Sequence, residues 1–170
     1  MISQAMQDAF NKQINEELAS AYIYAAMANY FDHLSLKGFA HWMTLQTREE
    51  LGHAQRLVKF LNDRGGRVIL EAIPAPPAEW PTPLAAFEDA YKHECHISKC
   101  INELSTMAVN EKDHASHAFL EWFVTEQVEE ESNADGIVQQ LKLVEGAPSG
   151  LFLIDRELAQ RQAAADSPAA

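Results

Sequence analysis

The chain has 170 residues, 47% of them hydrophobic, and a formal net charge of -12, which predicts one domain with a substantial apolar core. The acidic charge argues against a nucleic acid or an anionic membrane as partner and favours the attraction of cations. No apolar run approaches the roughly 20 residues of a membrane span, and the first residues do not resemble a signal peptide. Cys95 and Cys100 cannot pair within the helix predicted for them, so reduced thiols and a cytoplasmic location are expected.

Two long helices are predicted in the first part of the chain, because apolar residues recur there at alternating spacings of three and four. The first helix runs from about Gln4 to Asp32. The second runs to about Arg64, with Ser35 as its candidate N-cap and Gly65-Gly66 as its end.

A proline-rich connection follows the second helix. Five of the seven prolines fall between residues 74 and 83, and the connection from about residue 65 to 81 shows no periodicity. If extended, it reaches about 55 Å, whereas the second helix is about 45 Å long. The connection can therefore cross the whole bundle, and the second and third helices are expected to run parallel.

Two further long helices and a short one complete the chain. The long ones are predicted at about 82–110 and 113–145, and the short one, capped by Ser149, ends at about Gln160. The short helix is apolar on one face and cannot stand alone, so we expect it at a subunit contact. The predicted fold class is an all-α four-helix bundle with one long crossover and a short fifth C-terminal helix. It forms a single domain over 1–162, followed by a disordered tail over 163–170.

Polar residues interrupt the apolar stripes at matching places in the two halves of the chain. Each half has one acid on its first helix and a polar pair, spaced i, i+3, on its second. The first set is Glu17, Glu50 and His53. The second set lies 77 positions later, residue by residue, and is Glu94, Gln127 and Glu130. In an antiparallel hairpin, residues equally distant from the turn lie side by side. The sequence therefore predicts that both sets meet at the middle of the bundle.

Four carboxylates and an imidazole in an apolar interior need neutralisation. At about 5 Å and an effective dielectric of about 20, each carboxylate pair repels by roughly 3 kcal/mol. Six pairs exceed the stability of a typical domain. Two divalent cations would balance four negative charges, and oxygen donors with one His favour iron or manganese, as in di-iron carboxylate bundles. The alternatives are a buried network of protonated acids, or acids that face solvent.

These motifs resemble the ferritin family, and specifically its non-haem prokaryotic members, over about residues 5–158. The matching segments are Asn15-Glu16-Glu17-Leu18, Tyr24, Glu49-Glu50-x-x-His53, Glu94, Glu121-Trp122, Glu126-Gln127-x-Glu129-Glu130 and Ile154-Asp155-x-Glu157-Leu158. The resemblance implies an iron-storage protein with ferroxidase activity. Such a protein is a homo-oligomeric shell of 24 subunits that oxidises Fe(II) with O₂ and stores ferric mineral inside.

The resemblance also implies roles for individual residues. One iron ion would be held by Glu17, Glu50 and His53, and the other by Glu50, Glu94 and Glu130, so that Glu50 bridges the two. Gln127 would lie close by and orient a ligand or the oxidant. A third iron site would use Glu49, Glu126, Glu129 and Glu130.

Other residues refine these expectations. The resemblance implies that Tyr24 hydrogen-bonds near the iron and donates an electron; the alternative is an ordinary core aromatic. No haem is expected, because Leu51 stands where bacterioferritins carry a haem-ligating Met. The remaining histidines are expected on the surface, namely His41, His93, His96, His114 and His117. Two rival functions stay open: a di-iron oxygenase acting on an organic substrate, and a non-catalytic metal-binding or structural shell.

Overall fold

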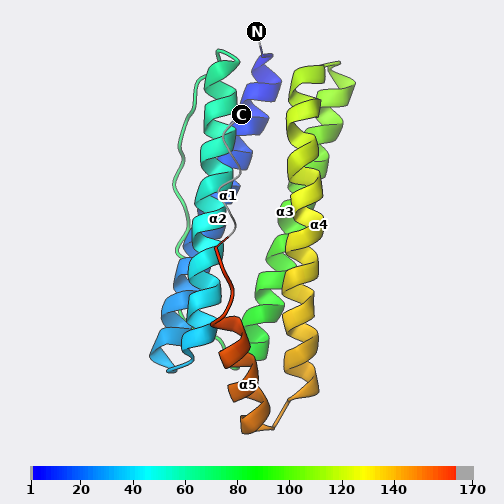
Figure 1. Cartoon of the computed structure of the whole chain (residues 1–170). Coiled ribbons are helices and arrows are strands. Elements are labelled where there is room, and N and C mark those ends of the chain that lie inside the picture. The colour runs from blue at the N-terminus through cyan, green and yellow to red at the C-terminus, as the bar shows by residue number, and fades with distance from the viewer. Residues whose placement is uncertain (1, 164–170) are drawn as a thin grey trace.

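The computed structural model describes residues 2–163, and all five elements in that range are helices. The bundle is formed by α1 (Gln4–His33), α2 (Lys37–Asp63), α3 (Pro83–Asn110) and α4 (His114–Leu143), and α5 (Pro148–Leu158) packs at one end of it (Figure 1). The predicted all-α four-helix bundle with a short fifth helix is confirmed. Within the described range, no helix is long and apolar enough to cross a membrane. The predicted tail lies outside the described residues from position 164 onward.

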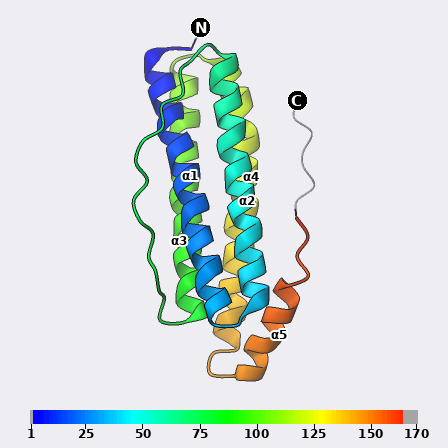
Figure 2. The same cartoon turned by 90° about the vertical axis from the view of Figure 1, so that its left-hand side faces the viewer.

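The connection between α2 and α3 runs back along the whole length of the bundle, so the two helices are parallel as predicted (Figures 1 and 2). Amide side chains on one face of α1, four residues apart, hold this connection by hydrogen bonds to its backbone. The bonded pairs are Gln7 with Arg67, Asn11 with Arg67 and Ile69, and Asn15 with Glu71. The polar face of α1 therefore guides the crossover.

Three of the long helices begin with side-chain caps. Ser3, Thr82 and Asp113 each accept a hydrogen bond from the backbone N–H three residues further on, which satisfies a donor that the helix itself leaves free. The predicted caps of α2 and α5 are wrong. Ser35 lies in the turn with a φ of 62°, and α5 already begins at Pro148, before Ser149.

A residue of α5 caps the start of α2 instead. Asp155 Oδ1 accepts hydrogen bonds from the backbone N–H groups of Gly38 (2.8 Å) and Phe39 (3.1 Å). A carboxylate at a helix N-terminus is also favoured by the helix dipole. The approach is so close that a Cβ on Gly38 would lie 1.6 Å from the Asp155 carbonyl oxygen. Glycine at position 38 is therefore required for α5 to dock.

We expect the Gly38→Ala variant to displace α5 and to lower the thermal midpoint by several degrees. The lost cap alone is worth about 1 kcal/mol, which corresponds to roughly 2–4 °C in a domain of this size. Differential scanning calorimetry measures the shift. Gly136→Ala in α4 is the control, because a Cβ there meets no atom of the described part of the chain within 4 Å. Equal melting of the two variants would contradict the docking role.

The apolar core is divided into two halves. One half surrounds Phe39 and Phe87 near α5, and the other surrounds Leu57 and Leu120 at the opposite end of the bundle. Both halves consist of buried hydrophobic side chains, so the polar positions of the four stripes form a separate layer between them.

Candidate metal centre

The layer between the two apolar halves contains the six residues that the offset of 77 brought together. Their exposed fractions are 1% for Glu17, 2% for Glu50, 6% for His53, 1% for Glu94, 5% for Gln127 and 5% for Glu130. Each of the four long helices contributes at least one of them. The alternative in which these acids face solvent is therefore excluded.

Glu17, Glu50 and His53 form a compact group in the layer. Nδ1 of His53 lies 3.7 Å from Glu17 Oε2 and 3.7 Å from Glu50 Oε2, and one ligand atom from each residue lies within 4.8 Å of the others. Glu17 Oε1 accepts a hydrogen bond from Gln13 Nε2 at 2.8 Å. Glu17 Oε2, in contrast, is buried and has no hydrogen-bond partner among the described residues. An orphaned carboxylate oxygen is costly unless a cation or a proton reaches it, so this donor set fits a divalent cation.

The other two carboxylates of the layer are held by neutral donors. Glu94 accepts hydrogen bonds from the Tyr24 hydroxyl and from Gln127 Nε2, the latter at 3.2 Å. Glu130 Oε2 accepts one from Gln46 Nε2 at 2.8 Å. These donors fix the direction of the carboxylates without neutralising their charge. Compensation of that charge is left to protons or cations.

Burial raises the pKa of the Glu50, Glu94 and Glu130 carboxyls, in the case of Glu130 to about 7. Repulsion from Glu94 adds to this effect on both Glu50 and Glu130. For His53, burial opposes the charged form, but the neighbouring carboxylates of Glu17 and Glu50, each 3.7 Å from Nδ1, outweigh it and raise the imidazole pKa. Burial therefore favours the protonated forms of these carboxyls when no cation is bound, and a cation that binds here would displace protons. A protonated network and a cation site are thus two states that the same donors allow.

Tyr24 is fully buried and combines core packing with a polar contact. Its ring packs edge-on against Trp42 and His93, with centroids 6.3 Å and 6.4 Å away, while its hydroxyl donates to Glu94. His93 is only partly exposed, and its Nε2 lies 2.7 Å from Ser20 Oγ. His93 is therefore partly covered, because α1 packs over the side of α3 that carries it.

The four residues predicted for a third iron site are Glu49, Glu126, Glu129 and Glu130. Glu126 and Glu130 approach each other, and together with His53 they place ligand atoms within 4.8 Å. Glu49 Oε2 instead accepts a hydrogen bond from Arg161 Nη2 at 2.7 Å, and Glu129 is exposed. Among the described residues, neither Glu49 nor Glu129 belongs to a compact group of ligand atoms.

Two buried amides of the layer were not predicted as site residues. Gln13 and Gln46 bond to Glu17 and Glu130 respectively. The available signal was their spacing, since each lies four residues before a predicted ligand, Glu17 or Glu50, on the same helix face. A Gln at such a position also fits a surface helix, so only their burial in the structure identifies Gln13 and Gln46 as parts of the layer.

Comparison with known proteins gives one consistent family. The Ferritin-like domain model matches residues 7–144. A bacterial non-heme ferritin of Bacteroides fragilis (strain 638R) is 44% identical over 161 residues, which cover 95% of this chain and 100% of that protein. A bacterial non-heme ferritin of Staphylococcus epidermidis is 38% identical over 161 residues, covering 95% and 97%.

Solved structures agree with these relatives. An open pore ferritin from the hyperthermophilic archaeon Archaeoglobus fulgidus superposes with a TM-score of 0.94 at 51% identity, covering 95% of this chain and 100% of that one. A humanized archaeal ferritin gives a TM-score of 0.96 at 48% identity, covering 97% and 100%. The similarity thus spans the bundle and α5.

Proposed function

The chain belongs to the ferritin family, and from this premise we propose that it oxidises Fe(II) with O₂ in the buried layer and stores the ferric product inside a shell of 24 copies. One observation carries the proposal: Glu17 Oε2 is buried and has no hydrogen-bond partner within residues 2–163, beside Glu50 and His53, whose ligand atoms lie within 4.8 Å. A folded protein keeps such an arrangement where a cation is to bind.

Iron is the substrate of this reaction. We assign one Fe(II) to Glu17, Glu50 and His53, and a second to Glu50, Glu94 and Glu130. Two Fe(II) ions held side by side each supply one electron, so O₂ receives two electrons without release of a one-electron product. Glu50 belongs to the group with Glu17 and His53, and its pKa is raised by burial and further by repulsion from Glu94 and Glu17, so its carboxylate experiences the charge of an acid from each proposed ligand set. It is therefore the residue we assign as the bridge.

The amides around the layer keep the ligands in place. Gln13, Gln46 and Gln127 donate to Glu17, Glu130 and Glu94, respectively. An amide carries no charge in any protonation state, so these bonds persist when protons are exchanged for iron. Hydrogen bonds of this kind, made to the side chains that bind the metal, orient those side chains and sustain metal affinity. For the third iron site we retain Glu49, Glu126, Glu129 and Glu130, of which Glu126 and Glu130 place ligand atoms beside His53.

The experiment that tests this function combines size and activity. The purified protein is passed through gel filtration, and Fe(II) is then added in air while the near-ultraviolet absorbance of ferric product is followed. We expect elution as a shell and rapid growth of the ferric signal. A shell that does not accelerate oxidation would support a structural role instead. O₂ consumption that depends on an organic additive would support an oxygenase.

Removal of the Tyr24 hydroxyl is expected to slow Fe(II) oxidation by roughly 10-fold, the lower end for loss of a contact to a metal ligand. Tyr24→Phe keeps the ring packing but deletes the bond to Glu94. Tyr30→Phe is the matched control, because its hydroxyl donates to the Trp80 carbonyl at 2.8 Å, outside the layer. Stopped-flow oxidation rates measure both. Equal oxidation rates for the two variants would show that Tyr24 acts only as a core aromatic residue.

A charge at position 152 is expected to break the shell into smaller oligomers. Phe152 and Leu153 on α5 are 60% and 65% exposed in the single chain, and large apolar side chains in that state indicate a contact surface. Light scattering on Phe152→Glu measures the particle mass. Gln160→Glu, an equal charge change at an exposed position just after α5, should leave the mass unchanged. An intact Phe152→Glu shell would refute the contact.

A further inference from the structure

A second group of possible metal ligands lies on the solvent-facing side of the bundle, between α1 and α3. Glu16 Oε2 is 3.1 Å from His96 Nε2, and Cys100 Sγ is 3.6 Å from the same nitrogen. All three ligand atoms lie within 4.8 Å of one another. His96 and Cys100 are one turn apart on α3, so their side chains share a face, and Glu16 reaches them from α1.

This group is separate from the buried layer. Glu16 precedes Glu17, and successive residues of a helix point about 100° apart. Glu17 is 1% exposed, whereas the side chains of Glu16 and His96 are 26% and 52% exposed. The group shares no residue with the buried centre, and a cation from solution can reach it directly.

Two of the three spacings, those from His96 Nε2 to Glu16 and Cys100, are close to the spacings in a tetrahedral zinc site. Zinc bonds of about 2.0–2.1 Å to nitrogen and oxygen and about 2.3 Å to sulfur place neighbouring ligand atoms about 3.3–3.6 Å apart. The distances of 3.1 Å and 3.6 Å differ from these values by a few tenths of an ångström at most. A cation can therefore be accommodated by small side-chain movements, with water at the fourth position.

The chemistry of the donors selects the kind of cation. A thiolate and an imidazole favour zinc and its neighbours, whereas magnesium and calcium prefer sites made of oxygen alone. The thiolate of Cys100 and the carboxylate of Glu16 together balance two positive charges. The buried layer has no sulfur ligand, so the two sites differ in preference as well as in position.

We propose that Glu16, His96 and Cys100 form an accessory binding site for a borderline divalent cation, for which Zn²⁺ is the best match. On binding, the Cys100 S–H bond is replaced by a sulfur–metal bond and the proton passes to solvent, with no change of oxidation state. This site does not depend on the iron-oxidising function assigned to the buried layer.

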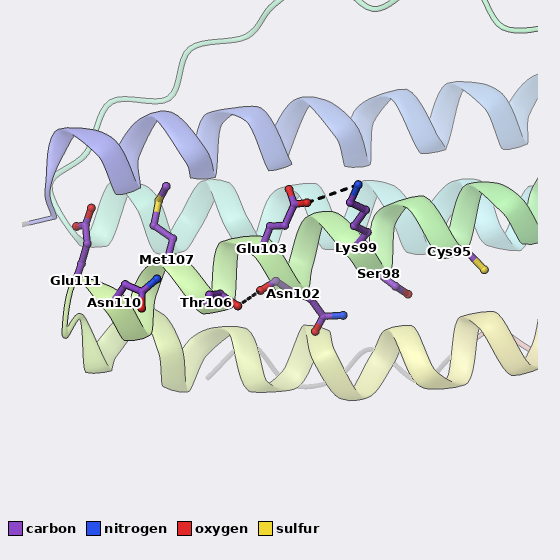
Figure 3. Close-up of a pocket in the computed structure, with 9 residues that line it drawn as sticks. All are labelled: Cys95, Ser98, Lys99, Asn102, Glu103, Thr106, Met107, Asn110 and Glu111. Atoms are coloured by element: carbon purple, nitrogen blue, oxygen red, sulfur yellow. Dashed lines mark hydrogen bonds and ion pairs between the residues drawn. The ribbon is translucent and has the colours of Figure 1, made fainter.

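Cys95 provides a matched control on the same helix. It lies at one end of a shallow groove along α3, beside Ser98 and Lys99 (Figure 3). None of the residues that line this groove is a histidine, and no group of three possible ligands among the described residues includes Cys95. Cys95→Ser therefore removes a thiol without touching the proposed site.

Anaerobic titration of the full-length protein with Co²⁺ tests the proposal. A thiolate bound to Co²⁺ gives a near-ultraviolet charge-transfer band, which carboxylate and imidazole ligands do not. We expect this band in the wild type and in Cys95→Ser, its loss in Cys100→Ser, and its displacement by Zn²⁺. Retention of the band in Cys100→Ser, or its loss in Cys95→Ser, would overturn the proposal.

A second measurement needs no variant and guards against misfolding. The two thiols of the wild-type protein are alkylated with and without Zn²⁺, and peptide mass spectrometry follows each one. At a Zn²⁺ concentration roughly 10 times its dissociation constant, labelling of Cys100 should slow about 10-fold, in proportion to the free fraction. Labelling of Cys95 should not change. Labelling of Cys100 at an unaltered rate in saturating Zn²⁺ would exclude the site.

Discussion

Glu50→Gln is expected to slow aerobic Fe(II) oxidation by at least about 100-fold, since even partners of metal ligands contribute 10–100-fold. The same substitution is expected to raise the thermal midpoint of the metal-free protein. Glu50 is 2% exposed, and burial together with Glu94 and Glu17 disfavours its charge. Glutamine keeps the volume and removes the charge, so function and stability should move in opposite directions. Stopped-flow kinetics and calorimetry measure the two effects.

Glu103→Gln is the matched control for this variant. Its carboxylate lies on the surface of α3, 3.8 Å from Lys99 Nζ, with a side chain that is 64% exposed, and neither the oxidation rate nor the midpoint should change. A Glu50→Gln protein that oxidises Fe(II) at the wild-type rate would show that Glu50 is not a ligand of the proposed iron centre. A lower midpoint would show that the carboxyl stabilises the metal-free fold.

The metal-free protein is expected to lose stability as the pH rises from about 5 to about 8. The folded pKa values of Glu50, Glu94 and Glu130 lie above the ordinary value. Protonation of these carboxyls therefore adds to the free energy of unfolding. This contribution is complete below about pH 4.3, the pKa of an unfolded Glu, and disappears as the pH rises through the pKa values of the folded protein. For Glu130, with a pKa of about 7, the loss is on the order of 3 kcal/mol. The raised pKa of His53 acts in the same direction, because its stabilised charged form is also lost as the pH rises.

Calorimetry between pH 5 and 8 measures this dependence in chelator-treated protein and in protein loaded with Mn²⁺. A hard cation that does not oxidise fills the carboxylate layer and takes the place of the protons, so the loaded protein should show a flatter profile. Glu130→Gln should flatten the metal-free profile as well, because it removes one titrating group. A metal-free profile that is already flat would contradict the proton-retaining layer.

Periodicity alone was sufficient to predict which faces of the long helices lie inward. Glu17, Glu50 and Glu94 are buried because they occupy positions in otherwise apolar stripes, and a helix cannot expose one residue of a stripe without exposing its neighbours. The length of the proline-rich connection likewise predicted the parallel course of α2 and α3, since the chain must return along the bundle. These properties are local or depend on chain length, so they do not depend on how individual side chains pack.

The sequence by itself thus determined the helices, their inward faces and the level at which the polar groups meet. Only the tertiary structure decided which side chains satisfy one another. Asp155 caps α2 from 117 residues away, although Ser35 stood closer in the chain. Gln46 of α2 bonds to Glu130 of α4. His96 and Cys100 meet Glu16 because α3 packs beside α1. Spacing along a helix gives the direction of a side chain, but its partner depends on the rotation and offset of the neighbouring helix, which packing sets.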